Sequence, residues 1–300
     1  MPELPEVEAL RLGLESRIIG AKILNIKVKS SMGKIVSSNG TTRKSNPLKV
    51  LEFENLPISK KIISLQRRAK NITINLDDGS LFLVHLKMTG QLVFVSSHNE
   101  KLIGGHPTKE STETLPHKHT YIIFELTNGT LYYNDVRQFG YMLYFASKAN
   151  FEKLGHFAKL GAEPLSKNFD FKTFLVNLKG KTGTLKKVLL DQTVVVGCGN
   201  IYVDEVCFAS GVLPTRQCKS LTPSEIQNLY NNIRRILHHA VEQGGSSVAN
   251  YLLVDGSRGN YADFHNVYGK SGKPCTICGT TLSSIKFAGR STVFCDTCQI

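Results

Sequence analysis

The chain has no long hydrophobic run. None of its apolar stretches approaches the roughly 18 residues that a membrane-spanning helix requires. Its first eight residues carry three glutamates and contain no hydrophobic stretch of the kind that opens a secretory signal. We also find no internal repeat. These absences argue against a membrane protein and a secreted protein, so we expect a soluble protein of the cytoplasm. The length of 300 residues indicates about two domains.

Acidic residues are in short supply. The 300 residues include 24 aspartates and glutamates against 37 lysines and arginines, which gives a formal net charge of +13 at pH 7. An excess of this size favours a polyanionic partner. Ordinary solubility charge is the alternative, and the motifs described below have to decide between the two.

Cysteine is scarce except near the end of the chain. Cys198, Cys207 and Cys218 are scattered and read as reduced thiols. The other four follow the spacing C-x2-C-x16-C-x2-C, which is typical of a structural zinc ribbon: Cys275, Cys278, Cys295 and Cys298. Disulfides and free buried thiols are the alternatives, and they fit a cytosolic chain less well. We therefore expect one structural zinc ion per chain, with no open coordination position for catalysis.

The first half of the chain is expected to be mainly β structure. Apolar residues at positions 7, 10, 14 and 18 predict a helix over residues 5–19, which begins with a proline and acidic residues. Turn sequences at 77–80 and 127–130 predict hairpins. Strands are predicted at 22–28, 48–53, 61–66, 71–76, 81–86, 121–126 and 131–134. Together they indicate a β-sandwich.

The second half is expected to be helical. Helices are predicted at 185–190 and 201–209, and a capping box at Thr222 and Glu225 opens a third helix that ends near Glu242. Residues 244–272 are rich in Gly, Ser, Asn and Asp and indicate a loop. Segments 30–46 and 96–119 are polar and aperiodic, so we interpret them as surface insertions.

The opening residues suggest a reactive amine. Methionine is normally removed before a residue as small as Pro2, which would then offer a secondary amine. Such an amine condenses with a sugar aldehyde to a cationic iminium that promotes β-elimination. Glu3 lies beside it and could carry protons, and Glu6 follows one helical turn later. The structural alternative is that proline and glutamate are simply favoured in the first turn of a helix.

Six motifs in order give the chain a resemblance to a known family. They are MPELPEVE at 1–8, RRAK at 67–70, HLKMTG at 85–90, DVRQFG at 135–140, GCGNIY at 197–202 and GRST at 289–292. The chain resembles the formamidopyrimidine-DNA glycosylase and endonuclease VIII family of base-excision repair enzymes over nearly its full length.

The resemblance implies an α+β fold with two lobes. An N-terminal helix and β-sandwich would occupy residues 1–150, and a helix–two-turns–helix domain residues 151–243. A flexible loop that covers the flipped base would occupy 244–266, and a zinc-finger hairpin 267–300. Double-stranded DNA would cross a basic cleft between the lobes, with the damaged nucleotide flipped out of the duplex because a stacked base hides the atom to be attacked.

The resemblance also assigns catalytic roles by position. Pro2 matches the nucleophile that attacks C1′ and displaces the base, and Glu3 matches the acid that opens the ribose ring. Glu6 matches a residue that orders this site. Lys70 matches a cation at the target phosphate, where both elimination steps expel phosphate oxyanions. Without the family, Lys70 would be read as a solvated lysine in a basic run.

Six further residues match DNA contacts of the family. Three match phosphate contacts: His85, Asn200 in the turn after Gly197, and Arg290 at the tip of the zinc hairpin. Three match a set that fills the gap left by the flipped base, with the arginine reading the orphaned partner: Met88, Arg137 and Phe139. Outside the family context Met88 and Phe139 would be ordinary core residues, and His85 and Asn200 ordinary strand and turn residues.

The sequence therefore predicts a bifunctional DNA glycosylase and abasic-site lyase. It would act as a monomer on damaged double-stranded DNA, in a cytoplasmic, nucleoid-associated setting, without a catalytic metal or diffusible cofactor. The expected substrates are oxidised purines, namely 8-oxoguanine opposite cytosine and formamidopyrimidines, and the strand would be cut by β- and δ-elimination.

Three other interpretations remain open. The first is an endonuclease VIII-type glycosylase for oxidised pyrimidines, which Leu4 and the complete gap-filling set disfavour. The second is a DNA-binding repair factor of the same fold without catalysis, and the third is an unrelated zinc-ribbon protein, which leaves the N-terminal motif unexplained.

The sequence departs from the family pattern in two details: segment 244–251 lacks the usual Thr-Leu-Arg-Asp type of run, and Cys198 replaces a small aliphatic residue.

Overall fold

The chain folds into two compact units. The computed structural model describes residues 1–29, 35–38, 46–105, 114–155, 157–246 and 261–300. Unit 1 comprises Met1–Phe157 and Gly244–Asn260, and unit 2 comprises Ala158–Gln243 and Tyr261–Ile300. Within the described ranges, no helix combines the length and the apolar character needed to cross a membrane.

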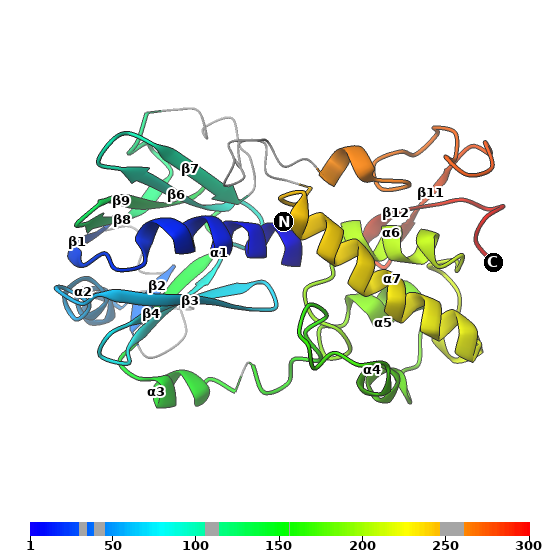
Figure 1. Cartoon of the computed structure of the whole chain (residues 1–300), viewed down its shortest axis with the longest axis horizontal. Coiled ribbons are helices and arrows are strands. Elements are labelled where there is room, and N and C mark those ends of the chain that lie inside the picture. Colours follow the sequence, from blue (N-terminus) through cyan, green and yellow to red (C-terminus); the bar gives the residue numbers. More distant parts are fainter. Residues whose placement is uncertain (30–34, 39–45, 106–113, 156, 247–260) are drawn as a thin grey trace. The chain divides into compact units, whose positions relative to one another are not determined.

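Unit 1 begins with helix α1 (Leu4–Ile18), which confirms the first predicted helix (Figure 1). Val7, Leu10, Leu14 and Ile18 are all buried, as the spacing of three and four residues requires. The helix packs against strands of both sheets of the unit, β7 (Lys101–Gly105) in one and β3 (Ile62–Arg68) in the other. The N-terminal residues are thus fixed by a helix that closes one side of the sandwich.

The predicted β-sandwich is confirmed as two five-stranded sheets. The first has the order β1 (Ile23–Val28), β8 (Thr120–Leu126), β9 (Gly129–Asp135), β6 (Gly90–Ser96) and β7 (Lys101–Gly105). The second has the order β2 (Val36–Ser38), β10 (Tyr141–Phe145), β5 (Leu81–His85), β4 (Asn71–Leu76) and β3 (Ile62–Arg68). Phe82 and Phe124 meet edge to face between the sheets, with ring centroids 5.3 Å apart.

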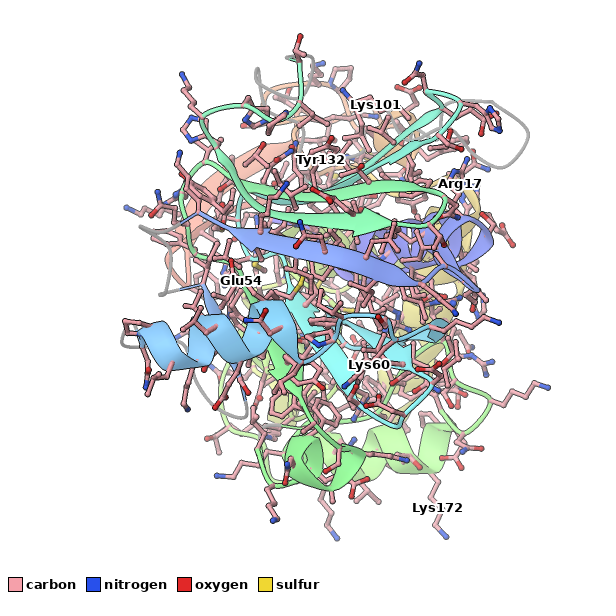
Figure 2. All side chains as sticks on the ribbon, turned by 90° about the vertical axis from the view of Figure 1, so that its left-hand side faces the viewer. Arg17, Glu54, Lys60, Lys101, Tyr132 and Lys172 are labelled. Carbon is pink, nitrogen blue, oxygen red and sulfur yellow. The ribbon has the colours of Figure 1, made fainter. Side chains whose placement is uncertain are left out.

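One predicted strand is wrong. Residues 48–53 are not a strand but lie in helix α2 (Pro47–Asn55), which lies beside β1 (Figure 2). The reason is local: Pro47 sits at the first helical position, and the Asn46 side chain accepts hydrogen bonds from the backbone N–H groups of Leu48 and Lys49. Glu54, labelled in Figure 2, accepts a 2.8 Å hydrogen bond from the N–H of Val28 and so ties α2 to β1.

The two polar segments are only partly insertions. Lys101–Gly105 form the edge strand β7, which pairs with β6 and buries Leu102. Val36–Ser38 form β2, which pairs in parallel with β10. Residues 30–34, 39–45 and 106–113 of these segments lie outside the described residues. Strands β6 and β10 and the short helix α3 (Lys148–Glu152) were also not anticipated from the sequence.

Unit 2 is helical with one hairpin, as expected. Helices α5 (Leu185–Leu190), α6 (Asn200–Ala209) and α7 (Pro223–Glu242) confirm the three predicted ones, and α7 has the capping box of Thr222 and Glu225. Helix α4 (Phe171–Leu178) was missed; Asp170 caps it by accepting from the N–H of Thr173. The remaining elements are η3 (Cys218–Ser220), η4 (Tyr261–Phe264), β11 (Ser283–Phe287) and β12 (Arg290–Phe294). Residues 247–260 of the predicted loop lie outside the described ones.

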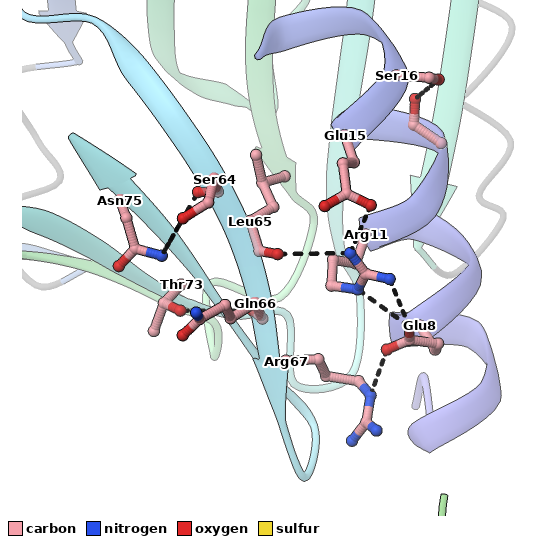
Figure 3. Close-up of polar contacts among 11 residues, drawn as sticks. Glu8, Arg11, Glu15, Ser16, Ser64, Leu65, Gln66, Arg67, Thr73 and Asn75 are labelled. Atoms are coloured by element: carbon pink, nitrogen blue, oxygen red, sulfur yellow. Dashed lines mark hydrogen bonds and ion pairs between the residues drawn. The ribbon is translucent and has the colours of Figure 1, made fainter. Parts of the chain in front are cut away.

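A carboxylate between two arginines attaches α1 to the second sheet (Figure 3). Glu8 accepts from Arg11 on its own helix at 2.7 Å and from Arg67 on β3 at 2.6 Å. Arg11 also donates to the backbone oxygen of Leu65 and to Glu15. Burial alone would raise the pKa of Glu8, but its hydrogen bonds and the two guanidinium charges hold that pKa below the ordinary 4.5.

Replacing this carboxylate should loosen α1. We expect Glu8→Gln to lower the free energy of unfolding at pH 7 by about 2 kcal/mol, because two guanidinium groups lose their charged partner. Since the pKa of Glu8 is depressed in the folded protein, its contribution is present above pH 4.5 and is lost as the pH falls through the folded value. Urea titrations at pH 7 and below pH 4 measure both effects. Glu15→Gln is the matched control, because Glu15 is another partner of Arg11 and is more exposed than Glu8. An equal loss of unfolding free energy in the two variants would contradict the anchoring role of Glu8.

Candidate functional site

The structure divides the predicted site residues between the two units. Unit 1 holds Pro2, Glu3, Glu6, Lys70, His85, Met88, Arg137 and Phe139. Unit 2 holds Asn200, Arg290 and the four cysteines Cys275, Cys278, Cys295 and Cys298. Pro2 and Glu3 directly precede α1, Glu6 lies in α1, and His85 ends β5. The others lie in the turns that follow β3, β5 and β9: Lys70, Met88, Arg137 and Phe139.

The N-terminal carboxylates are buried. Glu3 and Glu6 are 3% and 1% exposed, and Glu6 accepts a 2.7 Å hydrogen bond from the N–H of Glu3. The other oxygen of Glu6 accepts a 2.7 Å hydrogen bond from the N–H of Ser246. Gly245 has φ +83°, and a Cβ there would lie 2.8 Å from this oxygen. Glu6 therefore connects the start of the chain to Gly245 and Ser246. A side chain at position 245 would come too close to the Glu6 carboxylate, so glycine is required there.

The turn that carries Lys70 is connected to α1. Lys70 follows β3 and is 8% exposed, and Ala69 beside it has φ +54°. The Arg67 guanidinium, which pairs with Glu8 of α1, also donates to the backbone oxygen of Ala69 at 3.0 Å. One arginine thus couples the helix behind Pro2 to the turn that presents Lys70.

His85 ends β5 between two strands. Its partners in the sheet are Asn71 on β4 and Tyr141 on β10. The backbone N–H of Lys87 donates to its Nδ1 at 3.0 Å. Because Nδ1 accepts, the neutral ring carries its hydrogen on Nε2, which makes that atom a donor suited to an anion.

Two loops are held together by Asp135, which has no exposed surface. One of its oxygens accepts from the Thr89 hydroxyl at 2.5 Å and from the Arg137 N–H at 3.2 Å, and the other accepts from the Gly140 N–H at 2.8 Å. The Arg137 N–H also donates to the Thr89 hydroxyl. The loop after β5 and the loop after β9 are therefore fixed to each other by one buried carboxylate.

These two loops present exposed apolar side chains. Met88 is 38% exposed and Phe139 is 55% exposed, so the interpretation of both as ordinary core residues is wrong. The Arg137 guanidinium lies 4.6 Å from the centroid of the Phe139 ring. A protein exposes such groups together where they contact a partner. The sequence did not single out Asp135 and Thr89, although both lie inside the quoted motifs.

In unit 2 a buried ion pair holds the zinc hairpin to the helices. Lys186 on α5 and Asp204 on α6 are both fully buried, with 2.6 Å between Nζ and Oδ1. The Lys186 ammonium also donates to the Thr292 hydroxyl at 2.7 Å, and the Val293 N–H donates to Asp204. Burial raises the pKa of Asp204 to about 6, and the neighbouring ammonium acts in the opposite direction. This pair was not predicted from the sequence; the only signal for it was that Lys186 and Lys187 interrupt the leucines and valine of 185–190.

Asn200 belongs to the same attachment. Its side-chain amide donates to the backbone oxygen of Ser291 at 2.9 Å, at the start of α6. Gly197, three residues earlier, has φ +86° and allows the turn that leads into this helix. Arg290 begins β12 and is exposed, directly after Gly289 with φ +72°. The helix turn and the hairpin tip are therefore joined through strand β12.

The four cysteines fit a zinc ion. Their Sγ atoms all lie within 4.8 Å of one another, with 3.9 Å between Cys275 and Cys298 and 3.5 Å between Cys278 and Cys295. Tetrahedral zinc with Zn–S bonds of about 2.3 Å requires sulfur atoms about 3.8 Å apart. All seven cysteines are free of disulfides. The cluster is the structural zinc site that the spacing predicted.

Removing one ligand should release the metal. We expect Cys278→Ser to reduce the zinc content from about one ion per chain to well below half, since a serine hydroxyl is a poor zinc ligand. Elemental analysis of the purified chain measures this. Cys218→Ser, outside the cluster, is the control and should keep its zinc. Full zinc occupancy in Cys278→Ser would contradict the assignment of this ligand.

Family comparisons cover the regions that carry these features. Residues 1–142 match the formamidopyrimidine-DNA glycosylase N-terminal domain, 160–251 match the formamidopyrimidine-DNA glycosylase H2TH domain, and 272–300 match the zinc finger found in FPG and IleRS. Among curated proteins, the formamidopyrimidine-DNA glycosylase of Pelotomaculum thermopropionicum is 36% identical over 300 residues, covering 100% of this chain and 99% of the relative. That of Cytobacillus firmus is 37% identical, with 100% of each covered.

Solved structures agree with the sequence relatives. Lactococcus lactis Fpg in complex with DNA containing an abasic site has a TM-score of 0.83 and 33% identity, with 99% of each chain covered. MutM in complex with DNA containing carbocyclic 8-oxo-G has a TM-score of 0.81 and 32% identity, again with 99% of each chain covered. The chain and these solved structures therefore match over nearly their full lengths. The chain belongs to the formamidopyrimidine-DNA glycosylase family.

Proposed function

We propose that this protein is a bifunctional DNA glycosylase and abasic-site lyase of base-excision repair that removes oxidised purines. Full-length relatives at 36% and 37% identity carry the name formamidopyrimidine-DNA glycosylase. Similar solved structures hold DNA with Fapy-dG, with carbocyclic 8-oxo-G or with an abasic site. The net charge of +13 suits a DNA substrate.

The chemistry is proposed to begin at Pro2. After removal of Met1, the secondary amine attacks C1′ of the damaged nucleotide, and the bond from C1′ to the base breaks. Glu3 donates a proton to the ring oxygen, so the sugar opens and the nitrogen becomes an iminium. Loss of a C2′ proton then expels the 3′ phosphate, and a second elimination expels the 5′ phosphate. The observation that supports this best is the position of Pro2 next to two buried carboxylates in a chain of this family.

Lys70 and Glu6 are proposed to support these steps. The Lys70 ammonium would neutralise the phosphate oxyanions that both eliminations expel. Arg67 connects the turn of Lys70 to α1, which would keep the Lys70 ammonium and the Pro2 amine at a fixed distance from each other. Glu6 would keep the N-terminus in place through its hydrogen bonds to the N–H groups of Glu3 and Ser246.

Six residues are proposed to contact the DNA, three at its phosphates and three at the gap left by the flipped nucleotide. His85, Asn200 and Arg290 would bind phosphates. Met88, Arg137 and Phe139 would fill the gap left by the flipped nucleotide, and their exposure on two loops joined by Asp135 supports this role. The arginine would read the orphaned base through a bidentate donor pair.

The molecular setting completes the proposal. We expect a monomer that acts on damaged double-stranded DNA in the cytoplasm, in association with the nucleoid. Four consecutive segments would have separate roles: the catalytic helix and sandwich at 1–150, the DNA-binding helices at 151–243, a base-covering loop at 244–266 and the zinc hairpin at 267–300.

A borohydride trap tests the proposed chemistry. The protein, with its N-terminus checked by mass, is incubated with duplexes that carry 8-oxoguanine opposite cytosine, an oxidised pyrimidine or a simple abasic site. We expect the strongest covalent trapping on 8-oxoguanine. Preference for the pyrimidine would indicate the endonuclease VIII type, and tight binding without trapping on any duplex would indicate a DNA-binding protein without catalysis.

Replacing Pro2 should separate chemistry from binding. Pro2→Gln prevents removal of Met1, because methionine is removed only before small residues, and it removes the proline amine. We expect trapping to fall by more than about a hundredfold while DNA affinity changes little. Pro5→Ala is the matched control, since it replaces another proline of the same helix start and keeps the amine. Undiminished trapping by Pro2→Gln would show that another amine is the nucleophile.

Asp135→Asn should impair lesion excision more than folding. One carboxylate oxygen becomes an NH2 group, which cannot accept from Thr89 or from the Gly140 N–H, so the two exposed loops lose their common anchor. We expect kcat/KM on 8-oxoguanine duplex to fall roughly ten- to a hundredfold. A fluorescent base analogue beside the lesion should report weaker unstacking. Asp77→Asn, an exposed aspartate of unit 1, is the control, and equal activity of the two variants would argue against the anchor.

A further inference from the structure

Lys87 occupies an unusual place in unit 1. It lies in the turn between β5 and β6, between His85 and Met88, and its φ of +51° is in the left-handed region. Long side chains rarely adopt this conformation, which favours glycine. Its backbone N–H orients the His85 ring by donating to Nδ1. The turn thus places a lysine, at a conformational cost, beside two residues of the proposed DNA-binding site.

The Lys87 ammonium is half-buried without a carboxylate partner. It lies 5.7 Å from the centroid of the Tyr141 ring. Burial lowers the pKa of Lys87, and no acidic group contributes to its titration. In the placed part of the chain no ion pair includes Lys87. Asp135, the carboxylate of the adjacent loops, is already engaged by Thr89 and by backbone N–H groups.

A second lysine lies over a tyrosine ring of the same strand, β10, and shows the usual arrangement. Lys60 lies 5.3 Å from the centroid of the Tyr144 ring, also on β10. Its ammonium is paired with Asp78 at 2.6 Å, and this partner raises the pKa of Lys60 against the opposing effect of burial. Lys60 therefore has a carboxylate counter-ion and also donates to the Tyr144 hydroxyl at 2.7 Å, whereas the Lys87 ammonium lies over a tyrosine ring without a carboxylate partner. A desolvated cation of this kind is stabilised by an anion from outside.

The neighbouring groups indicate which anion this is. Tyr141 pairs with His85, and His85 pairs with Asn71, which directly follows Lys70. Lys87, His85 and Lys70 therefore come from adjoining strand ends at the same end of the second sheet. Three basic side chains at one sheet end suit a polyanion whose charges repeat along a backbone.

We propose that Lys87 is a further DNA-binding residue, which contacts a backbone phosphate beside His85. This inference rests on the proposed function, since it assumes that DNA is the partner. The Tyr141 ring, over which the ammonium lies, would hold the lysine in place in the same turn whose backbone orients His85. Phosphate contacts of this type set affinity and position and do not read sequence.

The test measures binding without chemistry. The full chain, Lys87→Gln, Lys87→Arg and Lys101→Gln are titrated with a duplex containing a tetrahydrofuran abasic-site analogue, at salt concentrations from about 50 to 200 mM. We expect Lys87→Gln to bind roughly three- to tenfold more weakly at about 100 mM salt, with a slope of log K against log salt shallower by about 0.9. Lys87→Arg should keep the slope. Lys101→Gln removes one charge from an exposed lysine of β7 and should match the original chain.

Lys87→Gly separates binding from structural support. Glycine adopts a φ of +51° readily, so this variant should unfold at the same or a higher temperature than the original chain. Its DNA affinity should nevertheless fall as in Lys87→Gln. A fall in both the unfolding temperature and the affinity would assign Lys87 a structural role and overturn the proposal, as would an unchanged salt slope in Lys87→Gln.

Borohydride trapping separates a failure of the Lys87 proposal from a failure of the proposed glycosylase and lyase reaction. If the original chain traps 8-oxoguanine duplex but the salt slope does not depend on Lys87, the inference fails and the proposed function stands. If the slope depends on Lys87 but the original chain traps no duplex, the inference stands and the catalytic proposal fails. Trapping by Pro2→Gln that disappears when Lys87→Gln is added would make Lys87 the reacting amine and overturn its assignment as a phosphate contact.

Discussion

The contact of Glu8 with two arginines is the interaction on which unit 1 depends. It joins α1, which presents the N-terminal residues, to β3, whose following turn presents Lys70. Arg67 extends the connection to the backbone of that turn. A helix held only by apolar packing can slide or rotate against a sheet with little penalty, whereas a charged hydrogen bond has a fixed length and direction. Polar contacts thus connect the helix that follows Pro2 to the turn that contains Lys70.

Unit 2 solves a similar problem with a buried ion pair. The four cysteines fit a metal ion inside the hairpin, and Cys275 and Cys295 also pack in one cluster with Phe208 of α6. Lys186 and Asp204 add a polar attachment to the helices through the hydroxyl of Thr292 and the N–H of Val293. Because both charges are fully buried, loss of either would leave the other uncompensated. Metal and ion pair therefore have separate tasks, one inside the hairpin and one at its base.

The sequence predicted features whose cause is local and missed those whose cause is distant. The helix after Pro2, the hairpin turns and the cysteine pairs depend on neighbours within a few residues. The segment 48–53 was misread because its apolar residues resemble a strand, while the helix start at Asn46 decides the outcome. Strand β7 exists because β6 pairs with it, and Asp135 and Lys186 gain their roles from partners far along the chain. The family resemblance supplied what spacing could not, namely the roles expected of residues such as Met88 and Phe139, whose apolar side chains are exposed.

The hydrogen bond between Glu6 and Ser246 has a consequence for synthesis. Unit 1 is made from two stretches of chain, and all of Ala158–Gln243 lies between them. A nascent chain emerges from its N-terminus, so the sandwich and α1 are complete long before Ser246 has been made. During that interval one oxygen of Glu6 has no main-chain donor from the later segment. The hydrogen bonds of Glu6 are therefore completed late, and a truncated chain that stops before residue 244 would lack the Ser246 donor to this carboxylate.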